Sequence, residues 1–255
     1  MYRPFDLTGR KVLVTGGNGG IGLGMARALA QAGAQVAIWG SNPDKTERAR
    51  QTLADEGADV LAYTCDVGDE QAVQAGVDQT VAALGGIDAC FANAGVSSRP
   101  TRMVDMSSDE FHRVLRINLD GVFYTARAVA RHMIEADNGG SLVFTASTAA
   151  VEGAARNSHY GASKGAVTSY ARALAVELAR HRIRVNSILP GWIRTDMTDR
   201  AMNDEKFAGN VLPRIPARRW GEIEDFGGIA VYLASDASSY HTGDQFIIDG
   251  GYTKF

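Results

Sequence analysis

Tyr160 and Lys164 stand four positions apart in the stretch YGASK. On a helix this spacing places both side chains on one face, about 6 Å apart along the axis. A free tyrosine has a pKa of about 10, and a neighbouring cation favours the phenolate and lowers that pKa. The pair therefore indicates an acid/base group suited to a hydroxyl/carbonyl pair, although two unrelated surface residues would show the same spacing.

Two polar residues earlier in the chain could join this pair. Ser147 lies 13 positions before Tyr160, at the end of the apolar run LVFTAS, where a serine can also simply hydrogen-bond the end of a strand. Thr145 and Thr148 are neighbouring hydroxyls in less favoured positions. Asn118, in RINL, falls inside a helical pattern, where asparagine is unfavourable unless its side chain finds a specific partner.

A glycine-rich segment, VLVTGGNGGIG at residues 12–22, joins a predicted strand to a predicted helix. A helix N-terminus presents free N–H groups and partial positive charge, which hold phosphate. Glycines let the backbone turn sharply and approach a pyrophosphate without a Cβ clash. The segment favours phosphate binding over a purely structural turn, and its spacing, TGxxxGxG, is neither GxGxxG nor the P-loop.

Strand and helix patterns alternate along the whole chain. Several apolar runs are nearly continuous, as a parallel sheet covered on both faces requires. The alternation predicts an α/β fold with a doubly wound, parallel, seven-stranded sheet, helices on both faces and one domain over residues 1–255. The predicted strands cover residues 11–15, 35–39, 60–65, 89–92, 140–146, 184–189 and 245–248, and the helices 20–31, 44–56, 69–84, 108–136, 160–180 and 222–234.

Residues 192–216 follow the sixth predicted strand and have a different character. From residue 196 onward the segment is polar and weakly periodic, and it ends in Pro213 and Pro216. Loops beyond the carboxyl ends of parallel strands line the ligand crevice. We therefore expect a substrate-binding lid here, the alternative being a tolerated surface excursion.

Composition excludes several functional classes. A net charge of −3 and a pI of about 6.0 indicate neither a nucleic-acid partner nor an anionic-membrane surface. No run is long enough to span a membrane and no secretion signal is visible, so we expect a cytoplasmic protein. Cys65 and Cys90 lie in apolar runs and predict buried free thiols. Five scattered histidines predict no metal site.

Six ordered motifs together resemble the short-chain dehydrogenase/reductase family, in its shorter-chained branch, over residues 7–255. The resemblance implies a single-domain Rossmann fold. It rests on TGxxxGxG at 15–22, Asp66-Val67 after the third strand, Asn93-Ala94-Gly95 after the fourth, Asn118 with Ser147 and Tyr160-xxx-Lys164, Pro190-Gly191 after the sixth, and TG…DGG at 242–251.

The resemblance implies an NAD(P)-dependent oxidoreductase that interconverts a secondary alcohol and a ketone. Tyr160 would exchange the proton, Ser147 would hydrogen-bond the reacting oxygen, Lys164 would bond the nicotinamide ribose and lower the Tyr160 pKa, and Asn118 would hold a relay water. A 3-oxoacyl-thioester reductase on an acyl-carrier protein or CoA is the alternative. A non-catalytic dinucleotide-binding sensor is an alternative of another class, which an intact catalytic set argues against.

The second strand ends in Trp39-Gly40-Ser41-Asn42, with no acid before Asp44 to meet the adenosine ribose. This favours NADP(H) over NAD(H), since Ser41, Asn42 and Lys45 could bind a 2′-phosphate, although the family's usual arginine near Ser41 and basic residue at Gly19 are absent. The expected cofactor contacts are Gly16, Asn18, Gly20, Ile21, Gly22, Ser41, Asn42, Asp66, Val67, Asn93, Ala94, Gly95, Tyr160, Lys164, Pro190, Gly191, Ile193 and Thr195.

The family also implies a homotetramer built on the helix at 160–180 and the C-terminal strand. Alanines on several sides of that helix would let it pack closely. A small-molecule carbonyl or alcohol is the expected substrate, held between residues 96–102, 151–159 and 192–215. Arg99, Arg102 and His159 could touch it there, or face solvent.

Overall fold

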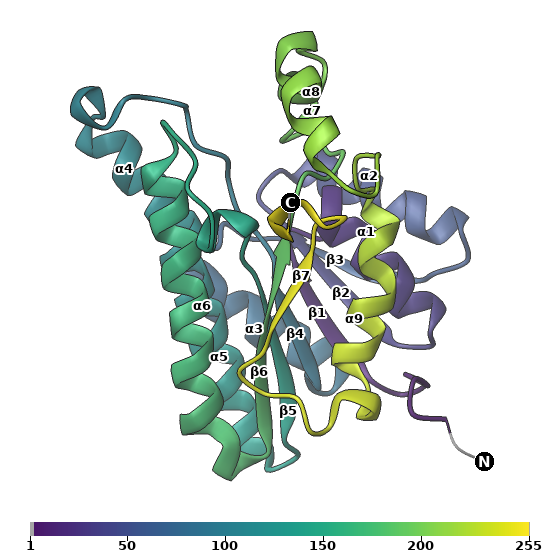
Figure 1. Ribbon diagram of the computed structural model, residues 1–255. Coiled ribbons are helices and arrows are strands. Elements are labelled where there is room, and N and C mark those ends of the chain that lie inside the picture. The colour runs from purple at the N-terminus through teal and green to yellow at the C-terminus, as the bar shows by residue number, and fades with distance from the viewer. Residues whose placement is uncertain (1–2, 255) are drawn as a thin grey trace.

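A parallel seven-stranded sheet runs through the centre of the molecule (Figure 1). The computed structural model describes residues 3–254, so residues 1, 2 and 255 of the expected domain lie outside it. The strand order is β3-β2-β1-β4-β5-β6-β7, which places the topological switch point between β1 and β4. The strands are β1 Lys11–Thr15, β2 Gln35–Gly40, β3 Val60–Thr64, β4 Ala89–Ala92, β5 Gly140–Thr145, β6 Ile183–Pro190 and β7 Gln245–Ile248.

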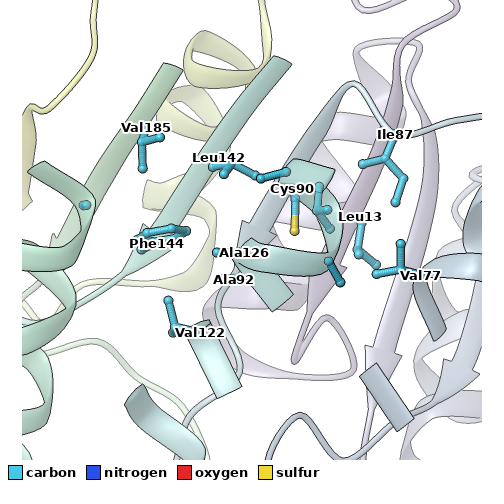
Figure 2. Packing of buried hydrophobic residues seen from close by; sticks show 14 of the residues in the cluster. Leu13, Val77, Ile87, Cys90, Ala92, Val122, Ala126, Leu142, Phe144 and Val185 are labelled. Carbon is cyan, nitrogen blue, oxygen red and sulfur yellow. The ribbon is translucent and has the colours of Figure 1, made fainter. Parts of the chain in front are cut away.

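Helices cover both faces of the sheet, which confirms the predicted fold class (Figure 1). On one face α3, α5 and α6 bury Leu13, Cys90 and Phe144 among their own apolar side chains (Figure 2). On the other face α1, α2 and α9 cover the alternate residues of the same strands. The bounds are α1 Gly20–Gln31, α2 Pro43–Asp55, α3 Glu70–Leu84, α5 Gly121–Ala136, α6 Ser158–Leu178 and α9 Gly227–Ala234.

The predicted helix at 108–136 is interrupted. It begins as expected at Ser108, with Ser107 as its N-cap, and runs as α4 Ser108–Leu115. Residues Arg116–Asp120 then form a π-helical turn before α5 begins. Such turns are rare and occur often at functional sites, and this one carries Asn118.

The segment expected to be an irregular lid contains two short helices, α7 Asp199–Met202 and α8 Glu205–Val211. They project beyond the carboxyl ends of the strands (Figure 1). A small apolar cluster of their own, including Met202, Val211 and Trp220, holds them together. Neither helix could be predicted from the polar sequence, because each buries a single residue, Met202 in α7 and Val211 in α8.

Both cysteines are buried free thiols, as predicted. Burial raises the pKa of the Cys65 thiol to about 11 and raises that of Cys90 further, so neither is a reactive thiolate at neutral pH. Across residues 3–254, no helix combines the length and apolar character needed to cross a membrane. Within the same range, no group of three or more potential metal ligands comes together.

Candidate active site

One cavity of about 260 Å³ lies at the carboxyl ends of the strands and joins the glycine turn to the catalytic candidates. Its floor is the switch point between β1 and β4, where an open α/β sheet binds its ligands. The sequence-predicted residues that line it are Gly16, Asn18, Gly20, Ile21, Asn93, Ala94, Gly95, Ser147, Tyr160, Lys164, Pro190, Gly191, Ile193 and Thr195.

The glycine turn is held in a conformation that side chains would disrupt. Gly16 and Gly20 have φ values of 64° and 52°, in the left-handed region. A Cβ on Gly22 would lie 2.2 Å from the carbonyl oxygen of Gly16, so this glycine lets α1 begin close against the turn. The turn and the N-terminus of α1 thus present bare backbone to the cavity, which fits the pyrophosphate of a dinucleotide.

Asn93 fastens the ends of β1 and β4 together. Its backbone N–H donates to Thr15 Oγ1 over 3.1 Å, and its side-chain Nδ2 donates to the Thr15 carbonyl over 3.1 Å. The Ala94 N–H shares the same Thr15 hydroxyl. These bonds hold the carboxyl ends of β1 and β4 together at the floor of the cavity.

The N-terminal part of α6 carries Tyr160 and Lys164 on the face that borders the cavity. The Lys164 side chain is buried, and its Nζ donates to the Thr145 carbonyl at the end of β5 over 2.8 Å. Burial lowers the pKa of Lys164 to about 8. Its Nζ lies 5.8 Å from the centroid of the Tyr160 ring, so the ammonium faces the phenol without bonding it.

The expectation that Lys164 brings the Tyr160 pKa below its ordinary value is wrong in this structure. Burial raises the pKa of Tyr160, and a hydrogen bond with the Ser147 side chain only partly offsets that rise. The phenol therefore keeps its proton at neutral pH. Ser147 follows β5, and its Oγ also accepts from the Ala149 N–H over 3.2 Å, which fixes the serine at the mouth of the cavity.

Asn118 is fully buried beneath the cavity and does not line it. Its Oδ1 accepts from the Val96 N–H over 2.8 Å, and its Nδ2 donates to the Val96 carbonyl and to Ser163 Oγ. The π-helical turn thus presents the asparagine to the segment after β4 and to α6 at once. Asn118 thereby joins two walls of the site.

Five predicted cofactor residues lie away from this cavity. Asp66 bonds Arg116 and the Gly68 N–H in a separate surface hollow. Asn42 caps α2 by accepting from the Lys45 N–H. Val67 is buried against α5, Gly22 packs in the turn, and Ser41 is exposed. The cavity also borders eight residues that were predicted neither as cofactor contacts nor as catalytic residues, namely Gly19, Lys45, Val96, Thr145, Ala146, Asp196, Met197 and Thr198.

Glu110 on α4 connects the segment 97–99 to the start of α6. Its carboxylate accepts from the Arg99 N–H over 2.9 Å and from Arg113 over 2.8 Å, and it faces His159 Nε2 at 3.4 Å. Arg113 in turn donates to the Ser97 carbonyl. These bonds lower the pKa of Glu110 to about 2. The residue preceding Tyr160 is thereby linked to the segment 97–99, and His159 is buried rather than facing solvent.

Replacing Glu110 by glutamine is expected to raise KM for the ketone about threefold to tenfold with kcat nearly unchanged. The amide keeps one acceptor but loses the charge that holds Arg113. Because the pKa of Glu110 is lowered, its carboxylate stabilises the folded wild type at pH values above about 4.5. This stabilisation is lost as the pH falls toward 2. Urea unfolding across that range should show a smaller pH dependence in the variant.

Glu47→Gln is the matched control, because Glu47 also pairs with an arginine three positions away but does so on the surface of α2. Exposed pairs contribute little, so this variant should keep the wild-type KM. Equal KM values for wild type and Glu110→Gln would show that the Glu110 network does not shape the substrate site.

Comparison with known proteins gives one consistent result. A family model described as enoyl-(acyl carrier protein) reductase matches residues 16–253. Gluconate 5-dehydrogenase of Gluconobacter oxydans is 36% identical over 249 residues, covering 98% of this chain and 96% of the relative. The 3-oxoacyl-[acyl-carrier-protein] reductase of Chlamydia pneumoniae is 38% identical over 247 residues, covering 97% and 98%.

A solved structure extends this similarity to three dimensions. The crystal structure of a gluconate 5-dehydrogenase from Burkholderia cenocepacia, in complex with NADP and tartrate, superposes with a TM-score of 0.93 at 35% identity. The match covers 99% of this chain and 98% of that one. The whole described fold, including the segment that carries α7 and α8, therefore has a counterpart in a known enzyme.

Proposed function

Because this chain belongs to the short-chain dehydrogenase/reductase family, we propose that Tyr160, Ser147 and Lys164 carry its chemistry. The protein is an NAD(P)-dependent oxidoreductase that interconverts a secondary alcohol and a ketone. We assign the chemistry to these three residues because one continuous cavity runs from the glycine turn to Tyr160. The glycine turn would hold the pyrophosphate of a dinucleotide, and the residues around Tyr160 would border its nicotinamide end.

Each residue of the site has a separate role in the proposed reaction. A bound nicotinamide supplies or accepts the hydride. Tyr160 donates its proton to the carbonyl oxygen in reduction and takes it back in oxidation, and its raised pKa keeps the donor form populated at neutral pH. Ser147 hydrogen-bonds the same oxygen and stabilises its developing charge. Lys164 would hold the nicotinamide ribose, and Asn118, through its bonds to Val96 and Ser163, orders the walls of the site.

We propose NADP(H) as the favoured cofactor. Gly40 ends β2 without a carboxylate, and a Cβ built there would lie 2.0 Å from Nδ2 of Asn18. The Asn18 side chain, which donates to Thr46 Oγ1 over 3.0 Å, thus fills the place of the acid that would bond a ribose diol. The NADP bound by the Burkholderia cenocepacia enzyme supports this preference for a similar chain.

We propose a polyhydroxylated keto acid as the substrate, on the strength of the gluconate dehydrogenases that this chain resembles. Arg102 pairs with Asp105 over 2.5 Å and Arg99 lies 3.9 Å from Glu110, so both already face a carboxylate of the chain. Arg156 fits better: it forms no ion pair within residues 3–254. Its φ of 67° and its carbonyl bond to the Thr101 N–H set it on the wall before Tyr160.

A 3-oxoacyl thioester is the second candidate substrate, since the Chlamydia pneumoniae relative is as similar as the gluconate enzymes. The test is oxidation of NADPH and NADH, followed by absorbance, with 5-ketogluconate, sorbose and acetoacetyl-CoA. The first proposal expects NADPH with 5-ketogluconate to give the highest kcat/KM. Preference for acetoacetyl-CoA would establish the second, and no turnover with any ketone would contradict both.

We propose that the protein assembles as a homotetramer. In the single chain, the outward face of α6 exposes Ala162, Ala173 and Val176, the last 83% exposed, beside the charged Arg172 and Glu177. Phe123 of α5 lies beside this face, 37% exposed and under the Arg127 guanidinium. A second copy would cover such a patch. Light scattering at micromolar concentration should give four times the mass of the chain, whereas a monomer would contradict the assignment.

We propose that residues 192–216 act as a lid over the substrate. The segment leaves β6 beside the cavity, which Thr195 and Met197 help to line. Its helices pack on their own cluster, where the Trp192 and Phe207 rings meet at 4.8 Å, apart from the two main cores. Ile193 at the start of the segment is buried in the main core, so the part that would shift as a lid is the part beyond it, with α7 and α8.

A further inference from the structure

Lys45 and Asp196 meet above the glycine turn, although 151 positions separate them in the chain. Lys45 lies in the first turn of α2, which follows β2, and Asp196 lies within the segment 192–216, which follows β6. The Lys45 Nζ lies 2.7 Å from Asp196 Oδ2. Both residues line the cavity, so this ion pair bridges its rim from two sides of the switch point.

The lysine occupies the space that a side chain on residue 19 would need. A Cβ built on Gly19 would lie 2.8 Å from both Cε and Nζ of Lys45. Thr195 covers the next glycine in the same way, with its Cγ2 3.2 Å from a Cβ built on Gly20. The bare glycine at position 19 therefore allows a cation from another element to reach the phosphate-binding turn.

The charges around the cavity are few. Of the described residues that line it, only Lys45 and Lys164 are cationic and only Asp196 carries a carboxylate. Lys164 lies among the catalytic residues and donates to Thr145, so Lys45 is the cation at the glycine turn. Asp196 is 87% exposed and has Lys45 as its ion-pair partner, a bond that lowers the Asp196 pKa.

We propose that Lys45 selects NADP(H) by binding its ribose 2′-phosphate, and that Asp196 is an internal competitor which that phosphate displaces. The inference rests on the proposed NADP(H) preference and assigns it to two residues. A phosphate carries more charge than a carboxylate and offers three acceptor oxygens, so it replaces Asp196 as the ion-pair partner of Lys45. The 2′-hydroxyl of NAD(H) cannot do so and leaves the pair intact.

Binding of NADP⁺ and NAD⁺ by isothermal titration calorimetry, without substrate, tests the assignment on the full chain. Lys45→Met should weaken NADP⁺ binding about tenfold to a hundredfold and change NAD⁺ binding less than about threefold. Asp196→Asn should tighten NADP⁺ binding about threefold to tenfold, because the competing charge is gone. Lys206→Met on α8, which forms no ion pair within the described chain, is the matched control and should alter neither.

Each contrary result has its own meaning. A wild type that binds NAD⁺ more tightly than NADP⁺ would overturn the cofactor preference itself. A Lys45→Met variant that keeps the wild-type preference for NADP⁺, or loses both cofactors equally, would leave that preference in place and overturn the role of Lys45. Unchanged or weaker NADP⁺ binding by Asp196→Asn would overturn the competition.

Discussion

Replacing Tyr160 by phenylalanine is expected to lower kcat for ketone reduction by about a hundredfold to ten-thousandfold while NADPH binding stays within about twofold. The ring and its packing remain, including the face that Lys164 approaches at 5.8 Å. Only the hydroxyl that donates the proton is removed, together with its bond to Ser147. Steady-state kinetics with NADPH and fluorescence titration of NADPH measure the two effects separately.

Tyr170→Phe is the matched control on the same helix. Tyr170 stacks on Phe144, with ring centroids 6.0 Å apart, and lies outside the cavity. Its variant should keep wild-type kcat. If Tyr160→Phe retained most of the wild-type activity, another group would have to supply the proton, and the proposed chemistry would fail.

Replacing Lys164 by methionine is expected to lower kcat/KM by a similar factor, about a hundredfold or more, and also to weaken NADPH binding. The variant loses the ammonium that faces Tyr160 and that, as proposed, would hold the cofactor ribose, so binding and catalysis should fall together, unlike in Tyr160→Phe. Unaltered binding of NADPH would contradict the proposed contact with the ribose. Lys11→Met, which removes a lysine bonded to Gly85 at the far end of β1, is the control.

The lowered pKa of Lys164 predicts the pH dependence of both activity and stability. The ammonium is present below about pH 8, so reductase activity should fall as pH rises through that value. Between about pH 8 and the ordinary lysine pKa of 10.5, Lys164 is protonated in the unfolded chain but not in the folded one. The contribution of Lys164 to the free energy of unfolding therefore increases as the pH rises through this range. Activity profiles and denaturant unfolding should show both trends, and Lys164→Met should lose the second.

The parts of the fold that follow from local pattern could be predicted. The TGxxxGxG turn and the YxxxK pair each depend on neighbouring residues within one strand–helix unit, and both lie where they were expected. The π-helical turn at Asn118 could not be predicted, because the residues around it fit an ordinary helix. Its cause is tertiary, since Asn118 bonds Val96 and Ser163 from two other elements.

The rim of the cofactor cavity shows the same limit. Lys45 could be named from the sequence as a possible 2′-phosphate ligand, but its place against Gly19 and its ion pair with Asp196 could not. The spacing of residues along the sequence does not predict an ion pair between residues 151 positions apart. Asp66 and Val67 show the converse, because their position after β3 was predicted correctly but their side chains face a separate hollow and the core.

The most direct test of the account follows the hydride itself. Wild-type protein is incubated with a reducible ketone and NADPH that carries deuterium at both positions of nicotinamide C4, and the alcohol is examined by mass spectrometry. The account predicts one deuterium per molecule of alcohol, on the carbinol carbon, and at least about a hundredfold less alcohol with Tyr160→Phe over the same time. Alcohol formed by the wild type without deuterium would contradict hydride transfer in this cavity.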